Sequence, residues 1–189
     1  MTHDLDKLST EELGKLFPIE IADYNPEWKN LFLLEKEKIK NSVGPGNIFR
    51  IEHIGSTAVP GLNSKPTMDI LLEIKETINI DKIVLQLKNL DYHFIPRPDN
   101  PPPHMMFAKG YSSKGYIGQS FHIHIRYKGD WDEIIFRDYL IQNPGTAQKY
   151  YLLKKRLASE FRNDREGYTN SKSDFISEIV RKARSKDQK

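Results

Sequence analysis

The stretch IFRIEHIGSTAVPGLNSKPTMDILLEI, residues 48–74, decides the fold. Apolar and polar side chains alternate over 48–54, which predicts a strand, and the mostly apolar run over 67–74 predicts a second, buried strand. The glycines and prolines between them exclude a long helix or strand there. Asp69 interrupts the second strand, and because an unpaired buried carboxylate is costly, this residue is the first candidate for a functional role.

The turn at Gly55 and Ser56, where the first predicted strand ends, is a candidate phosphate site. Glycine lets a phosphate approach the backbone closely, and the N–H groups that follow it, up to Thr57, and the Ser56 hydroxyl can donate to phosphate oxygens. Asp69 could then hold Mg²⁺, whose hard charge prefers carboxylate and phosphate oxygens. The alternative is an ordinary turn beside a hydrogen-bonded core aspartate.

A second polar group lies in the stretch SFHIHIR, residues 120–126. In a strand, the period of two places His122, His124 and Arg126 on one face and the apolar residues on the other. Two imidazoles about 7 Å apart along a strand are close enough to share a metal ion or an anion. Arg126 on this face and Lys65 are the candidate cations for a phosphate chain, although isolated basic residues are mostly solvated surface groups.

The rest of the chain mixes helix and strand patterns. Helices are expected at 8–17, 26–42, 81–90, 131–142, 144–161 and 172–182, a short strand or extended arm at 19–24, and strands at 92–95, 104–109 and 119–128. Four prolines within 97–103 predict a stiff surface loop. A length of 189 residues favours one domain over 1–189 with a helical C-terminal part, and we expect its tail, 183–189, to fray.

Composition excludes several functional classes. The chain has no Cys, so a disulfide framework, a thiolate nucleophile and a Cys-ligated metal are ruled out. It has no apolar run long enough to cross a membrane and no signal-peptide pattern at its start, so a soluble cytoplasmic protein is expected. The net charge is 29 − 26 = +3, too small to indicate a nucleic-acid partner, whereas small anions such as nucleotides remain open. The oligomeric state is left open.

These motifs resemble the GrpB family, an uncharacterised group whose fold is similar to that of nucleotidyltransferases. The resemblance rests on residues 12–17, 24–28, 53–62, 65–66, 69–71, 122–124, 131, 136–140, 168–172 and 175–176, of which 53–62 is the most specific. It implies an α/β (α+β) fold with a mixed, nucleotidyltransferase-like sheet flanked by helices. Some relatives are fused to dephospho-CoA kinase, which implies an association with coenzyme A metabolism.

Nucleotidyltransferases pair a Gly-Ser turn with an Asp-x-Asp or Asp-x-Glu motif and a third carboxylate on a later strand. Gly55 and Ser56 match the turn and Asp69 the first carboxylate, but Leu71 stands where the second belongs. His122 and His124 occupy the later strand. Two Mg²⁺ ions need several shared carboxylates, so a single divalent ion such as Mg²⁺, Mn²⁺ or Zn²⁺, or no metal, is expected instead.

The leading hypothesis is a divergent, metal-dependent nucleotidyltransferase that passes a nucleotidyl group from an NTP to an unknown acceptor. Its site consists of Asp69 as the catalytic residue, Gly55, Ser56, Thr57, Lys65 and Arg126 at the phosphates, and Asp69, His122 and His124 as metal ligands. The alternative is a non-catalytic module that binds a nucleotide or coenzyme, or docks on a partner, and has lost the catalytic carboxylates. A hydrolase built on the two histidines is less favoured, because no Ser-His-Asp or zinc-helix motif accompanies them.

Overall fold

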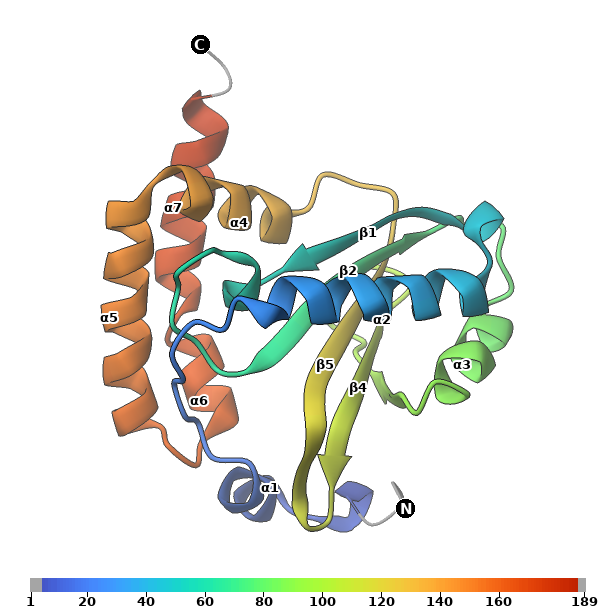
Figure 1. Cartoon of the computed structure of the whole chain (residues 1–189), viewed down its shortest axis with the longest axis horizontal. Helices are drawn as coiled ribbons and strands as arrows, with labels where there is room; N and C mark the ends of the chain where they lie inside the picture. The colour runs from blue at the N-terminus through green and yellow to red at the C-terminus, as the bar shows by residue number, and fades with distance from the viewer. Residues whose placement is uncertain (1–4, 187–189) are drawn as a thin grey trace.

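The two strands predicted within residues 48–74 are β1 (Ile48–Ile54) and β2 (Thr67–Ile74) of a five-stranded sheet. The structure, a computed structural model, describes residues 5–186. β1 and β2 are antiparallel, and β2 pairs in parallel with β5 (Gly115–Tyr127). Antiparallel pairs with β4 (Met105–Ser112) and β3 (His93–Pro96) complete the order β1-β2-β5-β4-β3. The expected α/β fold with a mixed sheet flanked by helices is confirmed (Figure 1).

The β4–β5 hairpin is longer than the sequence predicts. The two strands continue to Ser112 and restart at Gly115, where 110–118 was expected to be a connection. Gly110 lies at a bulge with a φ of +89°, and a Cβ there would meet the Gln119 carbonyl oxygen at 2.7 Å. Glycine inside a strand commonly marks a bulge, so taking it as the end of a strand was wrong here.

One face of the sheet carries the main hydrophobic core. α2 (Glu27–Val43) and α3 (Ile80–Lys88) pack on this face (Figure 1). Trp28, Phe32 and Ile39 of α2 belong to the same core as Ile70 of β2 and Ile123 of β5. The period of two then sends the side chains of the intervening strand residues, Asp69 and His122 among them, to the opposite face.

The C-terminal helices build a second core at one end of the sheet. α4 (Asp132–Gln142), α5 (Pro144–Glu160) and α7 (Ser173–Lys186) enclose apolar residues together with Val59 and Leu62 from the loop after β1 (Figure 1). A short helix that was not predicted, α6 (Arg165–Asn170), is capped by Asp164. Residues 183–186, expected to fray, continue α7, and Ala183 is buried; 187–189 lie outside the described residues.

The N-terminal segment connects the hairpin to the C-terminal helices. α1 (Thr10–Leu16) begins with a capping box between Ser9 and Glu12. The Phe17 ring packs 5.0 Å from the Tyr111 ring, and the Phe17 carbonyl accepts a hydrogen bond from Arg165 of α6. The segment expected at 19–24 to be a short strand or extended arm forms an isolated bridge, Ala22–Ser64, rather than a strand, and the Ile19 N–H also donates to the Arg162 carbonyl at 2.6 Å.

Residues 5–186 also contain three short 3-10 helices: η1 (Leu5–Lys7), which precedes α1, η2 (Pro45–Asn47) and η3 (Ser56–Ala58). η3 follows β1 after Gly55 and holds Ser56 and Thr57 of the predicted phosphate turn. In the described part of the chain, no helix is long and apolar enough to cross a membrane.

Candidate functional site

Asp69 and the two histidines meet on the face of the sheet opposite the main core. In the parallel pair of β2 and β5, Asp69 lies beside His122 and Leu71 beside His124. The Asp69 Oδ1 atom is 3.3 Å from His122 Nδ1 and 3.3 Å from His124 Nε2. Both imidazoles therefore converge on one carboxylate oxygen, in a group that the sequence pattern predicted.

Gly55 is required by its contact with Asp69. Its φ is +71°, in the region that favours glycine, and a Cβ at this position would lie 2.7 Å from Asp69 Oδ2. Any larger residue would displace the carboxylate. Ser56 follows in η3, where the Tyr150 hydroxyl of α5 hydrogen-bonds with it. Thr57 is buried, and its hydroxyl lies 2.9 Å from His53 Nε2, so that hydroxyl is already engaged away from Asp69.

His122 is held between Asp69 and Tyr111. Its Nε2 atom lies 2.8 Å from the Tyr111 hydroxyl, and the two rings are stacked with centroids 5.6 Å apart. Burial lowers the pKa of His122 and raises the pKa of Tyr111, which favours their neutral forms. Because Asp69 only accepts, neutral His122 donates to it from Nδ1 and accepts from Tyr111 at Nε2. Burial opposes ionisation of Asp69, but the bonds donated by His122 and His124 outweigh it and hold the pKa of Asp69 well below its usual range.

Four cationic side chains, which we call the cation cluster, interact electrostatically with one another, and two of them, Lys65 and Lys172, also with Asp69; the cluster is Lys65, Lys154, Arg165 and Lys172. The Lys65 and Lys172 ammonium groups lie 5.2 and 4.1 Å from the centre of the Tyr168 ring. Lys154 of α5 donates to the Asn63 carbonyl at 2.8 Å, and the Arg165 guanidinium lies 6.0 Å from the centre of the Tyr111 ring. The cluster thus joins the loop before β2 to α5, α6 and the segment that precedes α7.

The charges of the cation cluster are not balanced. Burial lowers the pKa of Lys65 to about 7, and repulsion from Arg165 and Lys172 adds to this effect. Burial and repulsion from Lys172 and Lys65 lower the pKa of Lys154 to about 7, and burial lowers that of Lys172 to about 8. Asp69 acts in the opposite direction on Lys65 and Lys172. Among residues 5–186, none of the four cations forms an ion pair with a carboxylate.

Of the residues singled out from the sequence, the structure brings together Gly55, Ser56, Lys65, Asp69, His122 and His124. Arg126 shares their strand face, but it is buried, its guanidinium pairs with Glu133 at 3.5 Å, and it lies 5.7 Å from the Trp131 ring. It is therefore engaged with the start of α4 rather than with the cation cluster.

Sequence reasoning missed most of the cation cluster. Lys154 and Arg165 lie in a basic C-terminal stretch to which we assigned no role from the sequence. Lys172, with Tyr168, lies in a run that carried the family resemblance but received no role. Tyr111 was placed in the connection between two strands, which hid its position beside His122. The sequence signal that could have indicated these cations is the alternation of basic and aromatic residues near the C-terminus.

The predicted metal ligands, Asp69, His122 and His124, are not arranged as a preformed metal site. In the part of the chain that the structure describes, no group of three or more His, Asp or Glu side chains is arranged to hold a metal ion. The predicted ligands bond to one another instead. Leu71, at the second carboxylate position, is 0% exposed, and Glu73 is bound by Arg50 at 2.8 Å. The donor set therefore does not fit a preformed metal centre.

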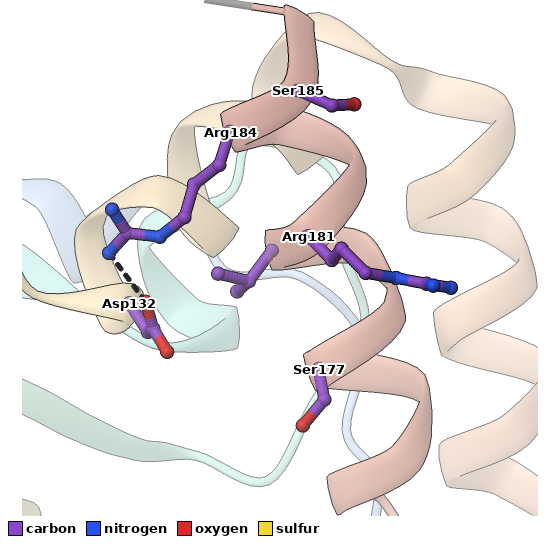
Figure 2. Close-up of a pocket in the computed structure, with 6 residues that line it drawn as sticks. Asp132, Ser177, Arg181, Arg184 and Ser185 are labelled. Carbon is purple, nitrogen blue, oxygen red and sulfur yellow. Dashed lines mark hydrogen bonds and ion pairs between the residues drawn. The ribbon is translucent and has the colours of Figure 1, made fainter.

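A hollow of about 440 Å³ lies elsewhere, between α4 and α7 (Figure 2). Its lining includes Asp132, Ser177, Arg181 and Arg184, and Arg184 forms an ion pair with Asp132 at 2.8 Å. These charges are paired or solvent-exposed, and the hollow shares no lining residue with the Asp69 site. It gives no reason to place the function there.

Comparison with known proteins agrees with the resemblance. The family described as GrpB protein matches residues 18–182. A UPF0157 protein of Pseudomonas aeruginosa is 36% identical over 167 residues, covering 87% of this chain and 67% of the relative. The crystal structure of the conserved protein GrpB from Enterococcus faecalis has a TM-score of 0.77 at 29% identity, covering 90% of this chain and all of that one. A dephospho-CoA kinase of Mycolicibacterium paratuberculosis is 22% identical, with 93% of this chain matching 48% of it. The chain belongs to the GrpB family.

Proposed function

We propose that this protein binds the phosphates of a nucleotide or a phosphorylated coenzyme beside Asp69. The observation that carries the proposal is the cation cluster: Lys65, Lys154, Arg165 and Lys172 lie close enough to interact, and among residues 5–186 the only carboxylate whose attraction acts on its lysines is Asp69. With full protonation the cluster exceeds Asp69 by three positive charges. Such an excess within a partly buried group favours a ligand that carries several negative charges.

The energetics of the ligand-free protein support this assignment. Burial lowers the pKa values of all three lysines, and repulsion from neighbouring cations adds to this effect for Lys65 and Lys154. A bound phosphate would supply the missing counter-charge and accept charge-assisted hydrogen bonds. The Ser56 hydroxyl, which already meets Tyr150, and the tight Gly55 turn lie on the Asp69 side of the same site.

We propose nucleotidyl transfer as the reaction of this site. An acceptor hydroxyl would attack the α-phosphorus of a nucleoside triphosphate, and the bond to the departing pyrophosphate would break. Asp69, ionised, would accept a hydrogen bond from the acceptor hydroxyl and orient it, the proton would pass to solvent as the new bond forms, and the cation cluster would stabilise the charge on pyrophosphate. The predicted divalent ion remains a prediction, and no step described here passes through it.

A binding module without turnover is the second candidate, favoured by one specific observation. Leu71 is fully buried where nucleotidyltransferases place their second carboxylate, and the next acid on the strand, Glu73, is bound by Arg50. The match to a dephospho-CoA kinase supports a coenzyme A precursor as the ligand in this case. A binding module would be stabilised by its ligand and leave it unchanged.

Thermal unfolding with a ligand panel tests the proposal. The panel contains the four NTPs, dephospho-CoA and CoA, each with EDTA, Mg²⁺, Mn²⁺ or Zn²⁺. A ligand at about 100 times its Kd adds about 2.7 kcal/mol, which raises Tm by several degrees. We expect this shift to be strongly reduced in Lys154→Met and retained in Lys155→Met, a matched change at an exposed neighbour. No shift with any phosphorylated ligand would refute the proposal, and release of pyrophosphate would separate the transferase from the binding module.

A further inference from the structure

Asp69 gives the site two chemically different halves. Its Oδ1 atom receives both imidazoles at 3.3 Å. From the described residues its Oδ2 atom accepts no hydrogen bond, although this oxygen lies on the side of Gly55, 2.7 Å from where a Cβ would stand, and the side chain is 32% exposed. The cation cluster offers only donors, whereas Oδ2 offers only an acceptor. A ligand that fills both halves must present negative charge to one and a hydrogen-bond donor to the other.

The charge of the surroundings limits which chemical group of the ligand can lie against Asp69 Oδ2. A phosphate oxygen would be repelled by an ionised carboxylate, so the phosphate itself does not belong there. An ammonium group would be attracted by Asp69 but repelled by the nearby cations, since Lys65 and Lys172 both interact electrostatically with this carboxylate. A neutral hydroxyl donates a hydrogen bond without adding charge, and so satisfies both conditions.

We therefore infer that the ligand is a phosphate ester of a polyol or sugar, with its phosphate on the cation cluster and a hydroxyl donating to Asp69 Oδ2. The inference rests on the proposed function and deepens it, because it names the group that must accompany the phosphate. Asp69 then distinguishes ligands with a hydroxyl from those without one, and the cation cluster provides the affinity for the phosphate. A divalent ion bridging Asp69 and the phosphate would produce the opposite dependence, since Asp69 would then contribute to the binding of every phosphate.

Affinities for three simple probes in EDTA test the inference: inorganic phosphate, propyl phosphate and glycerol 3-phosphate. The last two share the three-carbon chain and the phosphate and differ in two hydroxyls. We expect glycerol 3-phosphate to bind about tenfold more tightly, the usual worth of one hydrogen bond to a charged group. Asp69→Ala should abolish this preference while keeping or improving the affinity for inorganic phosphate. Asp69→Asn, which retains the side-chain shape, should reduce the preference and guards against misfolding of the alanine variant.

The outcomes separate this inference from the proposed function. Equal binding of propyl phosphate and glycerol 3-phosphate would overturn the inference and leave the phosphate site standing. A preference that persists in Asp69→Ala would also overturn it, because the hydroxyl would then meet another group. If the preference appears only with added Mg²⁺ or Mn²⁺, Asp69 acts through a metal and the inference fails. No binding of any of the three phosphates at millimolar concentration would refute the proposed function and this inference together.

Discussion

Two clusters of charge lie on opposite sides of the sheet and differ in how they are neutralised. On the α2 side, the buried Glu35 accepts from Lys109 at 2.8 Å, Lys38 at 3.1 Å and Tyr92 at 3.1 Å. Burial opposes ionisation of Glu35, but both lysines outweigh it and hold its pKa below the ordinary value. At the Asp69 site the cations face one carboxylate, without ion pairs of their own among the described residues. We call the Glu35 cluster balanced because each of its two lysines pairs with the carboxylate, and the Asp69 site unbalanced because, within residues 5–186, none of its four cations does. We propose that a ligand completes the unbalanced cluster.

Removing the central carboxylate of the balanced cluster should give the largest loss of stability. Glu35→Ala leaves Lys109 and the Tyr92 hydroxyl without their acceptor, and breaking such a buried pair costs about 3 kcal/mol. Urea unfolding measures this change. Glu37→Ala removes an exposed acid on the same helix, paired with Lys40 at 3.7 Å, and should cost less than about 0.5 kcal/mol. Phosphate binding should survive in both variants, and a loss of less than about 1 kcal/mol in Glu35→Ala would contradict a structural role.

Gly55→Ala should produce the next largest effect. The new Cβ combines a left-handed backbone with a 2.7 Å approach to Asp69 Oδ2, so we expect a loss of about 2–3 kcal/mol and displacement of the carboxylate. Gly61→Ala is the control, because its φ is +75° and a Cβ there would meet no atom within 4 Å. That variant should cost only about 1 kcal/mol, from the backbone alone. Equal losses in the two variants, measured by urea unfolding, would show that crowding on Asp69 contributes nothing.

Lys154→Met should separate stability from binding at the unbalanced cluster. Methionine fills a similar space and removes a buried charge that repels Lys65 and Lys172, although the bond to the Asn63 carbonyl is lost. We expect the free energy of unfolding to change by less than about 1 kcal/mol and the affinity for inorganic phosphate to fall about tenfold. Calorimetric titration beside Lys155→Met measures the second effect. Undiminished phosphate affinity in Lys154→Met would show that Lys154 does not take part in phosphate binding.

The two clusters also show what could be predicted from the sequence. β1, β2 and the face shared by His122 and His124 follow from alternation within single strands, which is a local signal, whereas the position of Asp69 beside them depends on the pairing of β2 with β5. The cation cluster depends on tertiary packing: Lys65 precedes β2, whereas Lys154 lies on α5, many residues later in the chain. A lysine that will be buried has the same sequence signature as a solvated one. Arg126 lies on the predicted strand face, but its guanidinium pairs with Glu133 of α4. This tertiary contact, which the strand pattern does not reveal, separates it from the cation cluster.

The pH dependence of the unbalanced cluster should have opposite signs for folding and for binding. The pKa values of Lys65 and Lys154 fall to about 7 and that of Lys172 to about 8 in the folded protein, from an unfolded value of 10.5. Between the folded and the unfolded pKa values, the unfolded chain binds more protons than the folded protein does. The free energy of unfolding of the ligand-free protein should therefore increase as the pH rises from 7 towards 10. Phosphate binding favours the protonated lysines, so affinity should fall over the same range.

Urea unfolding without phosphate and titration with inorganic phosphate, both from pH 6.5 to 9.5, measure the two slopes. Lys154→Met should flatten both slopes, since it removes one of the three titrating groups, whereas Lys155→Met should leave both unchanged. The Glu35 carboxylate adds no slope in this range, because it is already ionised and its pKa is lowered, whereas Tyr92, whose pKa burial raises, adds a small slope of the opposite sign only towards pH 9.5. Slopes of the same sign would mean that the lysines are already neutralised by groups within the chain, and the contrast between the two clusters would then be lost.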